Sequence, residues 1–306
     1  MSQLDRRSVL LSGVSAVLTA TGTSSLAQGH PSRPIRLLVP FAPGGTTDVV
    51  ARILADGLAK EMGQAVLVDN RVGAGGSIGA RELARAEPDG HTIGLMSVST
   101  HGTNSAVYKS LPYDVLRDFA PITKLLSFPG VIAVHPRFPA KDYAQFIRVL
   151  KAAPGRYSFA SSGTGGATHL AMEWFKSLTG TFIVHIPYRG SGPAINDVVA
   201  GQTEILWVAL PSALPFIKSG QLIAIGVAAP QRSSRLPDAP TFKELGPAGY
   251  EPDLWNGILA PPGLSKERVA ALHAALQRTA ARPEVKARFE DLGASIALGS
   301  PEALVA

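Results

Sequence analysis

The sequence predicts an α/β protein in which a mostly parallel sheet is covered by helices on both faces. Short apolar segments alternate with amphipathic segments between residues 35 and 97, at a spacing typical of β-α-β units. Glycine-rich turns follow the apolar segments, where a strand would pass into a helix. With 306 residues, 45% of them hydrophobic and 17% charged, the chain can bury one large core or two modest ones.

The first elements follow directly from this alternation. Ile35–Val39 is predicted as a strand, and Thr46–Met62 as a helix whose apolar residues share one face. The predicted elements after them are a strand at Ala65–Val68, a helix at about Ser77–Ala86 and a strand at His91–Ser97. Parallel sheets bind ligands at the carboxyl ends of their strands, so the glycine turns at those ends are candidate ligand loops.

The first glycine turn lies within Pro34–Asp48, between the first strand and the first helix. Gly44 and Gly45 allow the backbone to approach a ligand closely, and the first turn of the helix offers unpaired N–H groups. Such a loop favours a carboxylate or phosphate held by backbone dipoles. The alternative is a plain tight turn.

The second glycine loop, Asn70–Gly79, fits two catalytic motifs poorly. It contains a loose dinucleotide fingerprint, but no acidic residue closes the next strand. Gly75–Gly79 also matches the G-x-S-x-G elbow of hydrolases, with Ser77 as nucleophile. That elbow sits directly on a strand end, whereas Asp69–Ala74 intervene here. A second anion-binding loop is therefore predicted, with a serine hydrolase using Ser77 as the alternative.

A third segment, Tyr157–His169, again runs from a strand through small residues into a helix. Thr168 or Thr164 is predicted to cap that helix, and serine and threonine hydroxyls there can donate to a carboxylate. His169 and Glu173 have the i, i+4 spacing of a metal-ligand pair. No third ligand is evident, so a local helix pair is favoured and no metal is expected.

The N-terminus has the features of a secretory leader. Arg6 and Arg7 precede an apolar run from Val9 to about Ala20, and Ser25–Ala27 resembles a cleavage site. The paired arginines also resemble a twin-arginine signal. Residues 1–27 are therefore predicted to be a signal peptide, with the mature protein exported to the periplasm.

Composition excludes several classes of function. The chain has no cysteine, which rules out disulfides, thiolate metal sites and cysteine nucleophiles. The net charge is +6, but the basic residues are scattered and no basic, aromatic-rich patch indicates nucleic-acid binding. A mildly positive field favours small anions as ligands.

Several separate stretches together resemble the substrate-binding proteins of tripartite tricarboxylate transporters, known as Bug receptors. The matching stretches cover nearly all of the mature chain: Pro34–Asp48, Val68–Ala80, Asn104–Pro121, Tyr157–Phe175, His185–Gly201 and Trp255–Gly263. Their number and order make this resemblance more specific than any one glycine turn.

The resemblance implies a type II periplasmic-binding-protein fold, in which two doubly wound α/β lobes are joined by two crossover strands. The crossings are expected near Lys124–Phe128 and Ile223–Val227. Lobe 1 would then comprise residues 28–125 and 227–306, and lobe 2 residues 126–226. The two lobes would close on a ligand.

The resemblance also implies a site in which backbone amides, hydroxyls and water hold one ligand carboxylate, with few or no charged side chains. Carried over to this sequence, the first-lobe ligand residues are Phe41, Ala42, Gly44, Gly45, Thr46, Gly76, Ser77, Ser97, Ser99 and Thr100. The second-lobe ligand residues are Ser161, Thr164, Gly165, His169, Tyr188 and Asp197.

Two charged positions keep alternative interpretations. Asp197 would bind a ligand amine, orient water, or serve as a charge at a helix N-terminus. Arg189 would meet a second carboxylate or lie solvated at the lobe rim. Neither Arg71 nor Arg189 is expected to be essential for a monocarboxylate.

Two features depart from the family pattern. Glu204 stands where the family has aspartate, and the sequence ends at Ala306, soon after Pro301-Glu302, where the family continues into a helix.

The predicted function is a monomeric solute receptor, not an enzyme, without cofactor. It would capture a small carboxylate and deliver it to the membrane permease of a tripartite tricarboxylate transporter. A sensory carboxylate receptor is a further alternative.

Overall fold

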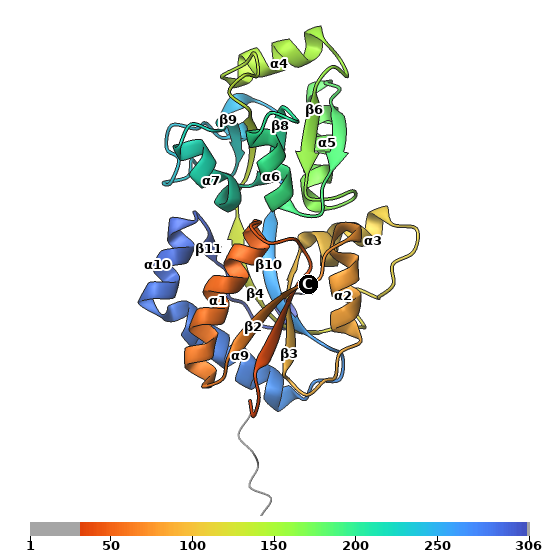
Figure 1. The fold of residues 1–306 in the computed structure, drawn as a ribbon, viewed down its shortest axis with the longest axis vertical. Coiled ribbons are helices and arrows are strands. Elements are labelled where there is room, and N and C mark those ends of the chain that lie inside the picture. Colours follow the sequence, from red (N-terminus) through yellow and green to blue (C-terminus); the bar gives the residue numbers. More distant parts are fainter. Residues whose placement is uncertain (1–30, 305–306) are drawn as a thin grey trace, which may run out of the picture.

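The computed structural model describes residues 31–304, so the predicted signal peptide lies outside the described residues. Two α/β lobes lie end to end, with the N- and C-terminal segments together in one lobe and the middle of the chain in the other (Figure 1). We call them lobe 1 and lobe 2. Among the described residues, no helix combines the length and apolarity needed to cross a membrane.

Lobe 1 contains a six-stranded sheet with the order β11-β4-β10-β3-β1-β2. Its strands are β1 (Ile35–Val39), β2 (Val66–Asn70), β3 (Thr92–Ser97), β4 (Ala120–Phe128), β10 (Leu254–Ala260) and β11 (Ser295–Ile296). β1 pairs in parallel with β2 and β3, whereas β10 runs antiparallel to β3 and β4. This sheet is therefore mixed.

Helices cover both faces of this sheet. They are α1 (Thr46–Met62), α2 (Ser77–Ala84), α3 (Asn104–Val107), α9 (Lys266–Ala281) and α10 (Pro283–Asp291), with short turns at Ala74–Gly76, Ser99–Thr103 and Glu302–Leu304. Successive strand residues point to opposite faces. Accordingly, Leu37 packs in the cluster that contains Leu54 of α1, while Leu38 packs in the one that contains Leu83 of α2.

Lobe 2 contains a five-stranded sheet with the order β7-β6-β8-β5-β9. Its strands are β5 (Gly130–Val134), β6 (Ser158–Ser161), β7 (Val184–Pro187), β8 (Ile205–Ala209) and β9 (Ile223–Ala228). Its helices are α4 (Tyr143–Ala152), α5 (Ala167–Thr179), α6 (Ser191–Val199) and α7 (Leu210–Lys218), and α8 (Phe242–Leu245) follows β9. β5 runs antiparallel to β8 and β9, so this sheet is mixed too.

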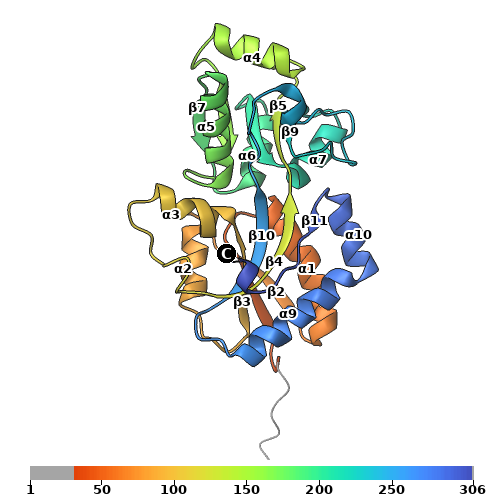
Figure 2. The ribbon, with the colours of Figure 1, turned by 180° about the vertical axis from the view of Figure 1, so that it is seen from behind.

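The two lobes are joined where β4 passes into β5 and where the chain returns from β9 to β10, as the reverse view shows (Figure 2). Pro129 is the single residue between β4 and β5. On the return side, β9 pairs with β5 as far as Ala228. The lobe limits at residues 125–126 and 226–227 stay a prediction.

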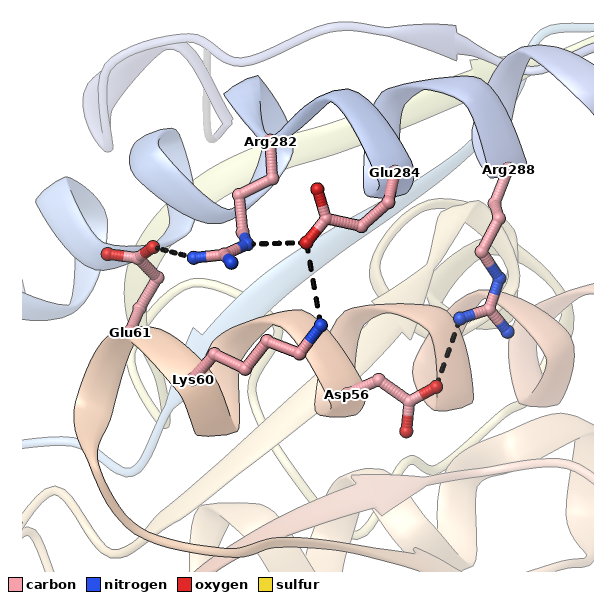
Figure 3. Close-up of polar contacts among 6 residues, drawn as sticks. All are labelled: Asp56, Lys60, Glu61, Arg282, Glu284 and Arg288. Carbon is pink, nitrogen blue, oxygen red and sulfur yellow. Dashed lines mark hydrogen bonds and ion pairs between the residues drawn. The ribbon is translucent and has the colours of Figure 1, made fainter.

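Ion pairs connect α1 to the start of α10 on the surface of lobe 1. Arg282 Nη1 lies 2.7 Å from Glu61 Oε1, and Arg288 Nη1 lies 3.0 Å from Asp56 Oδ2 (Figure 3). Glu284 accepts from Arg282 Nε at 2.9 Å and lies 3.5 Å from Lys60 Nζ. Each exposed pair contributes little by itself. Together they fix α10 beside α1.

The predicted two-lobe fold is confirmed, and the strands predicted between residues 35 and 97 are parallel as expected, although each complete sheet is mixed. The strands that connect the lobes enter each sheet antiparallel to their neighbours. The predicted bounds of β1 and α1 agree with the structure to the residue. β2, predicted at Ala65–Val68, instead spans Val66–Asn70.

Candidate ligand-binding site

A cavity of about 50 Å³ lies between the lobes, and no charged side chain lines it. Lobe 1 contributes Phe41, Gly45, Thr46, Thr47, Ser97, Val98, Ser99, Phe128, Leu254, Trp255 and Asn256 to its lining. Lobe 2 contributes Ser162, Ala167, Thr168, Ser191 and Ala209. Aromatic and aliphatic walls thus alternate with hydroxyl groups.

The N-termini of four helices meet at this cavity. The residues just before α1, α5, α6 and α7 are Gly45, Gly166, Gly190 and Ala209, and none of the four helices has a side-chain cap. Each helix places its first residues or its N-cap in the lining. Uncapped N-termini carry partial positive charge and unpaired N–H groups, so the cavity favours an anion without any basic side chain.

Some of these N–H groups already have partners within the protein. Ala167 N–H, in the first turn of α5, donates to Ser99 Oγ at 3.0 Å. Leu210 N–H, at the start of α7, donates to the Pro129 carbonyl at 2.8 Å. The first turns of α1 and α6 are therefore the main candidates to donate to a ligand.

Hydrogen bonds across the cleft hold the lobes together. Ala42 N–H donates to the Arg189 carbonyl at 3.1 Å, and Tyr108 Oη donates to the Thr164 carbonyl at 2.9 Å. Thr46 Oγ1 donates to Ser212 Oγ at 3.0 Å. With the Ala167–Ser99 bond, these contacts show that the described conformation is closed.

Glycines allow the lobes to approach this closely. A Cβ atom on Gly192 of α6 would lie 2.3 Å from the Pro43 carbonyl oxygen in lobe 1. A Cβ on Gly45 would lie 3.3 Å from Ser191 Cβ in lobe 2. Gly44 has a φ of +82°, which favours glycine whatever the available space. The loop before α1 thus needs glycine for its own conformation and for closure.

Asp48, in the first turn of α1, holds the same loop in place. Its buried carboxylate accepts from Gly44 N–H at 3.0 Å, from Asn70 Nδ2 at 3.0 Å and from Arg52. Burial opposes its ionisation, but the hydrogen bonds from Arg52, Gly44 and Asn70 outweigh that effect and hold its pKa below the usual range. Asp48 therefore stays charged and fixes the loop.

A second cavity of about 270 Å³ adjoins the first, and the two linings share Phe41 and Ser162. The other lining residues are Gly73, Ala74, Gly75, Gly76, Tyr108, Gly163, Thr164, Pro187, Tyr188 and Arg189. Tyr188 Oη donates to Asp197 at 2.7 Å. Burial, together with that hydrogen bond, raises the pKa of Tyr188 to about 12.

The structure brings half of the predicted site residues to these cavities. Those that line the first or the second are Phe41, Gly45, Thr46, Gly76, Ser97, Ser99, Thr164 and Tyr188. The others line neither cavity and are Ala42, Gly44, Ser77, Thr100, Ser161, Gly165, His169 and Asp197. Most of these eight residues belong to the loops that line the cavities or contact those loops.

His169 and His185 form a stacked pair behind the third glycine segment. Their ring centroids are 3.8 Å apart, and His185 also stacks on Phe159. His169 Nδ1 accepts from Gly165 N–H at 3.1 Å, and His185 Nε2 lies 2.6 Å from Ser161 Oγ. Burial, and then the neighbouring imidazole, lowers the pKa of His185 to about 4. His169 thus orders the loop from outside the cavity.

The prediction of a local pair between His169 and Glu173 agrees with their separation of 3.7 Å. Between residues 31 and 304, no group of three histidine or acidic side chains is placed to hold a metal ion.

Two expectations for individual residues are wrong. Gly166, not Thr168 or Thr164, precedes α5, and Thr168 Oγ1 instead accepts from Ser162 N–H at 2.9 Å. Asp197 lies toward the C-terminal end of α6, so it is no N-terminal charge. Its carboxylate accepts from Tyr188, and its role toward a ligand amine or water stays a prediction.

Sequence reasoning missed several lining residues, chiefly Thr47, Ser191, Trp255 and Asn256. Ser191 follows Gly190 after β7, the same strand, glycine and helix order that marked the other loops. Trp255 and Asn256 lie on β10, where no local pattern indicates that they face a cleft. Asn256 pairs in register with Ser97 of β3.

Comparison with known proteins agrees with this geometry. Residues 50–302 match the family described as tripartite tricarboxylate transporter family receptor. BugT of Bordetella pertussis is 35% identical over 277 residues, covering 90% of this chain and 85% of BugT.

Two solved structures extend the comparison. The periplasmic binding protein BugD superposes with a TM-score of 0.87 at 36% identity, covering 90% of this chain and 92% of BugD. MatC from Rhodopseudomonas palustris, solved with bound malate, superposes with a TM-score of 0.84 at 33% identity, covering 87% of this chain and 90% of MatC. The chain therefore belongs to the tripartite tricarboxylate transporter receptor family of solute-binding proteins.

Proposed function

We propose that this protein is a periplasmic receptor that binds a small carboxylate and delivers it to the permease of a tripartite tricarboxylate transporter. The observation that carries the proposal is the convergence of four helix N-termini, those of α1 and α6 with the main candidate N–H donors, on one cavity without charged side chains. MatC, a relative with the same fold, holds malate.

Ligand capture is a two-state process in this proposal. The carboxylate binds first to the loop before α1 in lobe 1, where Gly45 and Thr46 line the cavity. Closure then adds lobe-2 contacts and the hydrogen bonds between Ala42 and Arg189 and between Tyr108 and Thr164. A ligand shifts the equilibrium toward the closed form only to the extent that it binds the closed form more tightly than the open form.

Export and partners follow from the leader and the family. We infer that residues 1–27 direct the chain to the periplasm and that the permease recognises the closed, monomeric receptor. A sensory receptor that presents the closed form to another protein would use the same binding chemistry.

We infer that the protein is not a hydrolase. Ser77 is buried, and its hydroxyl accepts a hydrogen bond from Asn104 Nδ2 at 3.0 Å. Within residues 31–304, no histidine is hydrogen-bonded to Ser77, so the residue lacks the adjacent base that a nucleophilic serine needs.

A thermal-shift screen of carboxylic acids, each paired with its neutral amide, tests the proposal. A ligand at 100 times its dissociation constant stabilises the native state by about 2.7 kcal/mol, which raises the melting temperature measurably. We expect at least one acid to stabilise the mature protein and its amide to have no effect. Stabilisation by the amides alone, or by none of the acids, would contradict the proposal.

A further inference from the structure

The turn after β3 supplies part of the first cavity. Ser97 is the last residue of β3, Ser99 begins the π-helical turn Ser99–Thr103, and both serines line the cavity. The Ser97 hydroxyl is buried and has no hydrogen-bond partner among residues 31–304. Because an unpaired buried hydroxyl is costly, a ligand in this cavity is its natural partner. The direction of that hydroxyl depends on how the backbone of Ser97 is held.

Thr100 holds the backbone of Ser97 from both sides. Its fully buried hydroxyl accepts from Ser97 N–H at 3.1 Å and donates to the Ser97 carbonyl at 3.0 Å. A single side-chain oxygen thus fixes both polar groups of that residue. The backbone of Thr100 is held in turn, because its carbonyl accepts from Tyr113 Oη at 2.8 Å.

His101 occupies the remaining position on the Thr100 hydroxyl. Its Nδ1 lies 2.9 Å from Thr100 Oγ1. A hydroxyl has one proton and two lone pairs. The proton is directed to the Ser97 carbonyl and one lone pair accepts from Ser97 N–H. We therefore assign the His101 proton to Nδ1, because all three hydrogen bonds form together only if Nδ1–H donates to the second lone pair.

The surroundings of the imidazole agree with this tautomer. The ring centroid of His101 lies 4.4 Å from that of Phe119 and 6.2 Å from that of Tyr113. Nε2 is buried there without a partner in the described part of the chain. Unpaired buried N–H groups are rarer than unpaired buried acceptors, so a bare lone pair is favoured on Nε2. Burial lowers the pKa of His101 to about 4, which keeps the ring neutral.

We propose that His101 is a positioning residue for ligand binding, which acts through Thr100 on Ser97. Nδ1–H orients the Thr100 hydroxyl, that hydroxyl holds the backbone of Ser97, and the Ser97 hydroxyl meets the ligand. His101 itself lines neither cavity. This inference rests on the proposed function and adds to it a residue that does not touch the ligand.

Two substitutions of His101 separate positioning from packing. His101→Phe keeps an aromatic ring beside Phe119 and Tyr113 but removes the donor. His101→Asn loses the ring, but its amide Nδ2 can donate from the place of Nδ1. We expect the Phe variant to have the higher melting temperature of the two, yet to bind carboxylate about three- to tenfold more weakly than the wild type. The Asn variant should melt lower and keep its affinity within about twofold. If His101 served packing alone, affinity would follow the melting temperature.

A double-mutant cycle tests the path through Ser97. The probes are acetate, hexanoate, malate and adipate, measured by titration calorimetry. In a Ser97→Ala background, His101→Phe should weaken binding by less than about twofold, because the hydroxyl that it positions is gone. His273→Phe on α9 is the matched control and should leave affinity unchanged, since His273 bonds to the Gly299 carbonyl and lines neither cavity. Equal losses with and without the Ser97 hydroxyl would overturn the proposal, as would an Asn variant that binds as weakly as the Phe variant.

Hydrogen exchange gives a readout that needs no ligand. The Ser97 N–H, compared with the amides of β1 in the same sample, should exchange about fivefold faster in His101→Phe than in the wild type or His101→Asn. Unchanged exchange in the Phe variant would show that His101 does not hold Ser97, whether or not any acid binds. If exchange changes as expected but none of the four acids or those of the wider screen binds the wild type, the proposed function fails while the link from His101 to Ser97 stands.

Discussion

Gly192→Ala should hold the lobes apart without harming either one. The new methyl group would lie 2.3 Å from the Pro43 carbonyl oxygen, whereas real Cβ contacts are essentially never below 3.0 Å. The lobes must therefore separate there by about 0.7 Å. The hydrogen bond from Ala42 N–H to the Arg189 carbonyl, now 3.1 Å, would lengthen to about 3.8 Å and be lost.

The expected magnitude follows from these two effects. Loss of a neutral hydrogen bond costs about 1 kcal/mol, and the steric overlap costs about 1–3 kcal/mol. The closed state is then less stable by about 2–4 kcal/mol, which weakens ligand binding roughly 30- to 900-fold. Alanine is a better helix former than glycine, so lobe 2 itself should not lose stability.

Titration calorimetry with a carboxylate from the thermal-shift screen measures the affinity, and small-angle scattering measures closure. Gly299→Ala is the matched control, since its Cβ would make an ordinary contact of 3.5 Å with Ala303 Cβ. Gly45→Ala should show an intermediate loss, because its Cβ would approach Ser191 Cβ to 3.3 Å. If Gly192→Ala binds and closes like the wild type, the contact between α6 and Pro43 is absent from the ligand-bound state.

Three further predictions concern charge and burial. Arg71→Gln should lower the affinity for a monocarboxylate less than tenfold, as measured by calorimetry, because Arg71 pairs with Asp69 and Glu82 and lines neither cavity. Loss of all monocarboxylate binding would indicate that a charged side chain holds the carboxylate. Ser77→Ala should lower the free energy of unfolding by about 1–2 kcal/mol in urea, through the lost bond to buried Asn104, yet leave affinity nearly unchanged. The free energy of unfolding should also fall as the pH is lowered from about 6.5 to 4, since burial lowers the folded-state pKa of both His101 and His185 to about 4. Between those pH values the unfolded chain binds more protons than the folded one, so urea midpoints that rise on acidification would contradict the assignment.

The parts of the fold that were predictable depend on local pattern. The predicted bounds of β1 and α1 match the observed ones because the spacing of apolar residues changes from that of a strand to that of a helix at the glycine turn between them. The same order of strand, glycine and helix identified Gly45 and Thr46 as ligand residues, and both line the cavity.

The rest of the site depends on contacts between distant segments. Asn256 reaches the cavity because β10 pairs with β3 and places Asn256 opposite Ser97. No local sequence pattern indicates this pairing. Ser161 and His169 have suitable chemistry and lie in the right loop, but they bond to His185 and Gly165 instead of lining either cavity. Side-chain direction, rather than position along the chain, separates these cases.

The order of strands in lobe 1 has a consequence for the order of folding. β10 lies between β4 and β3, yet it follows every strand of lobe 2 along the chain. All strands of lobe 2 fall within residues 130–228, so its sheet can form from one continuous segment. As the chain emerges N-terminus first, β3 keeps an unpaired edge until β10 arrives, and such edges invite pairing with other chains. Lobe 1, though it begins first, is completed last, and chaperones that protect this receptor should act on its unfinished sheet.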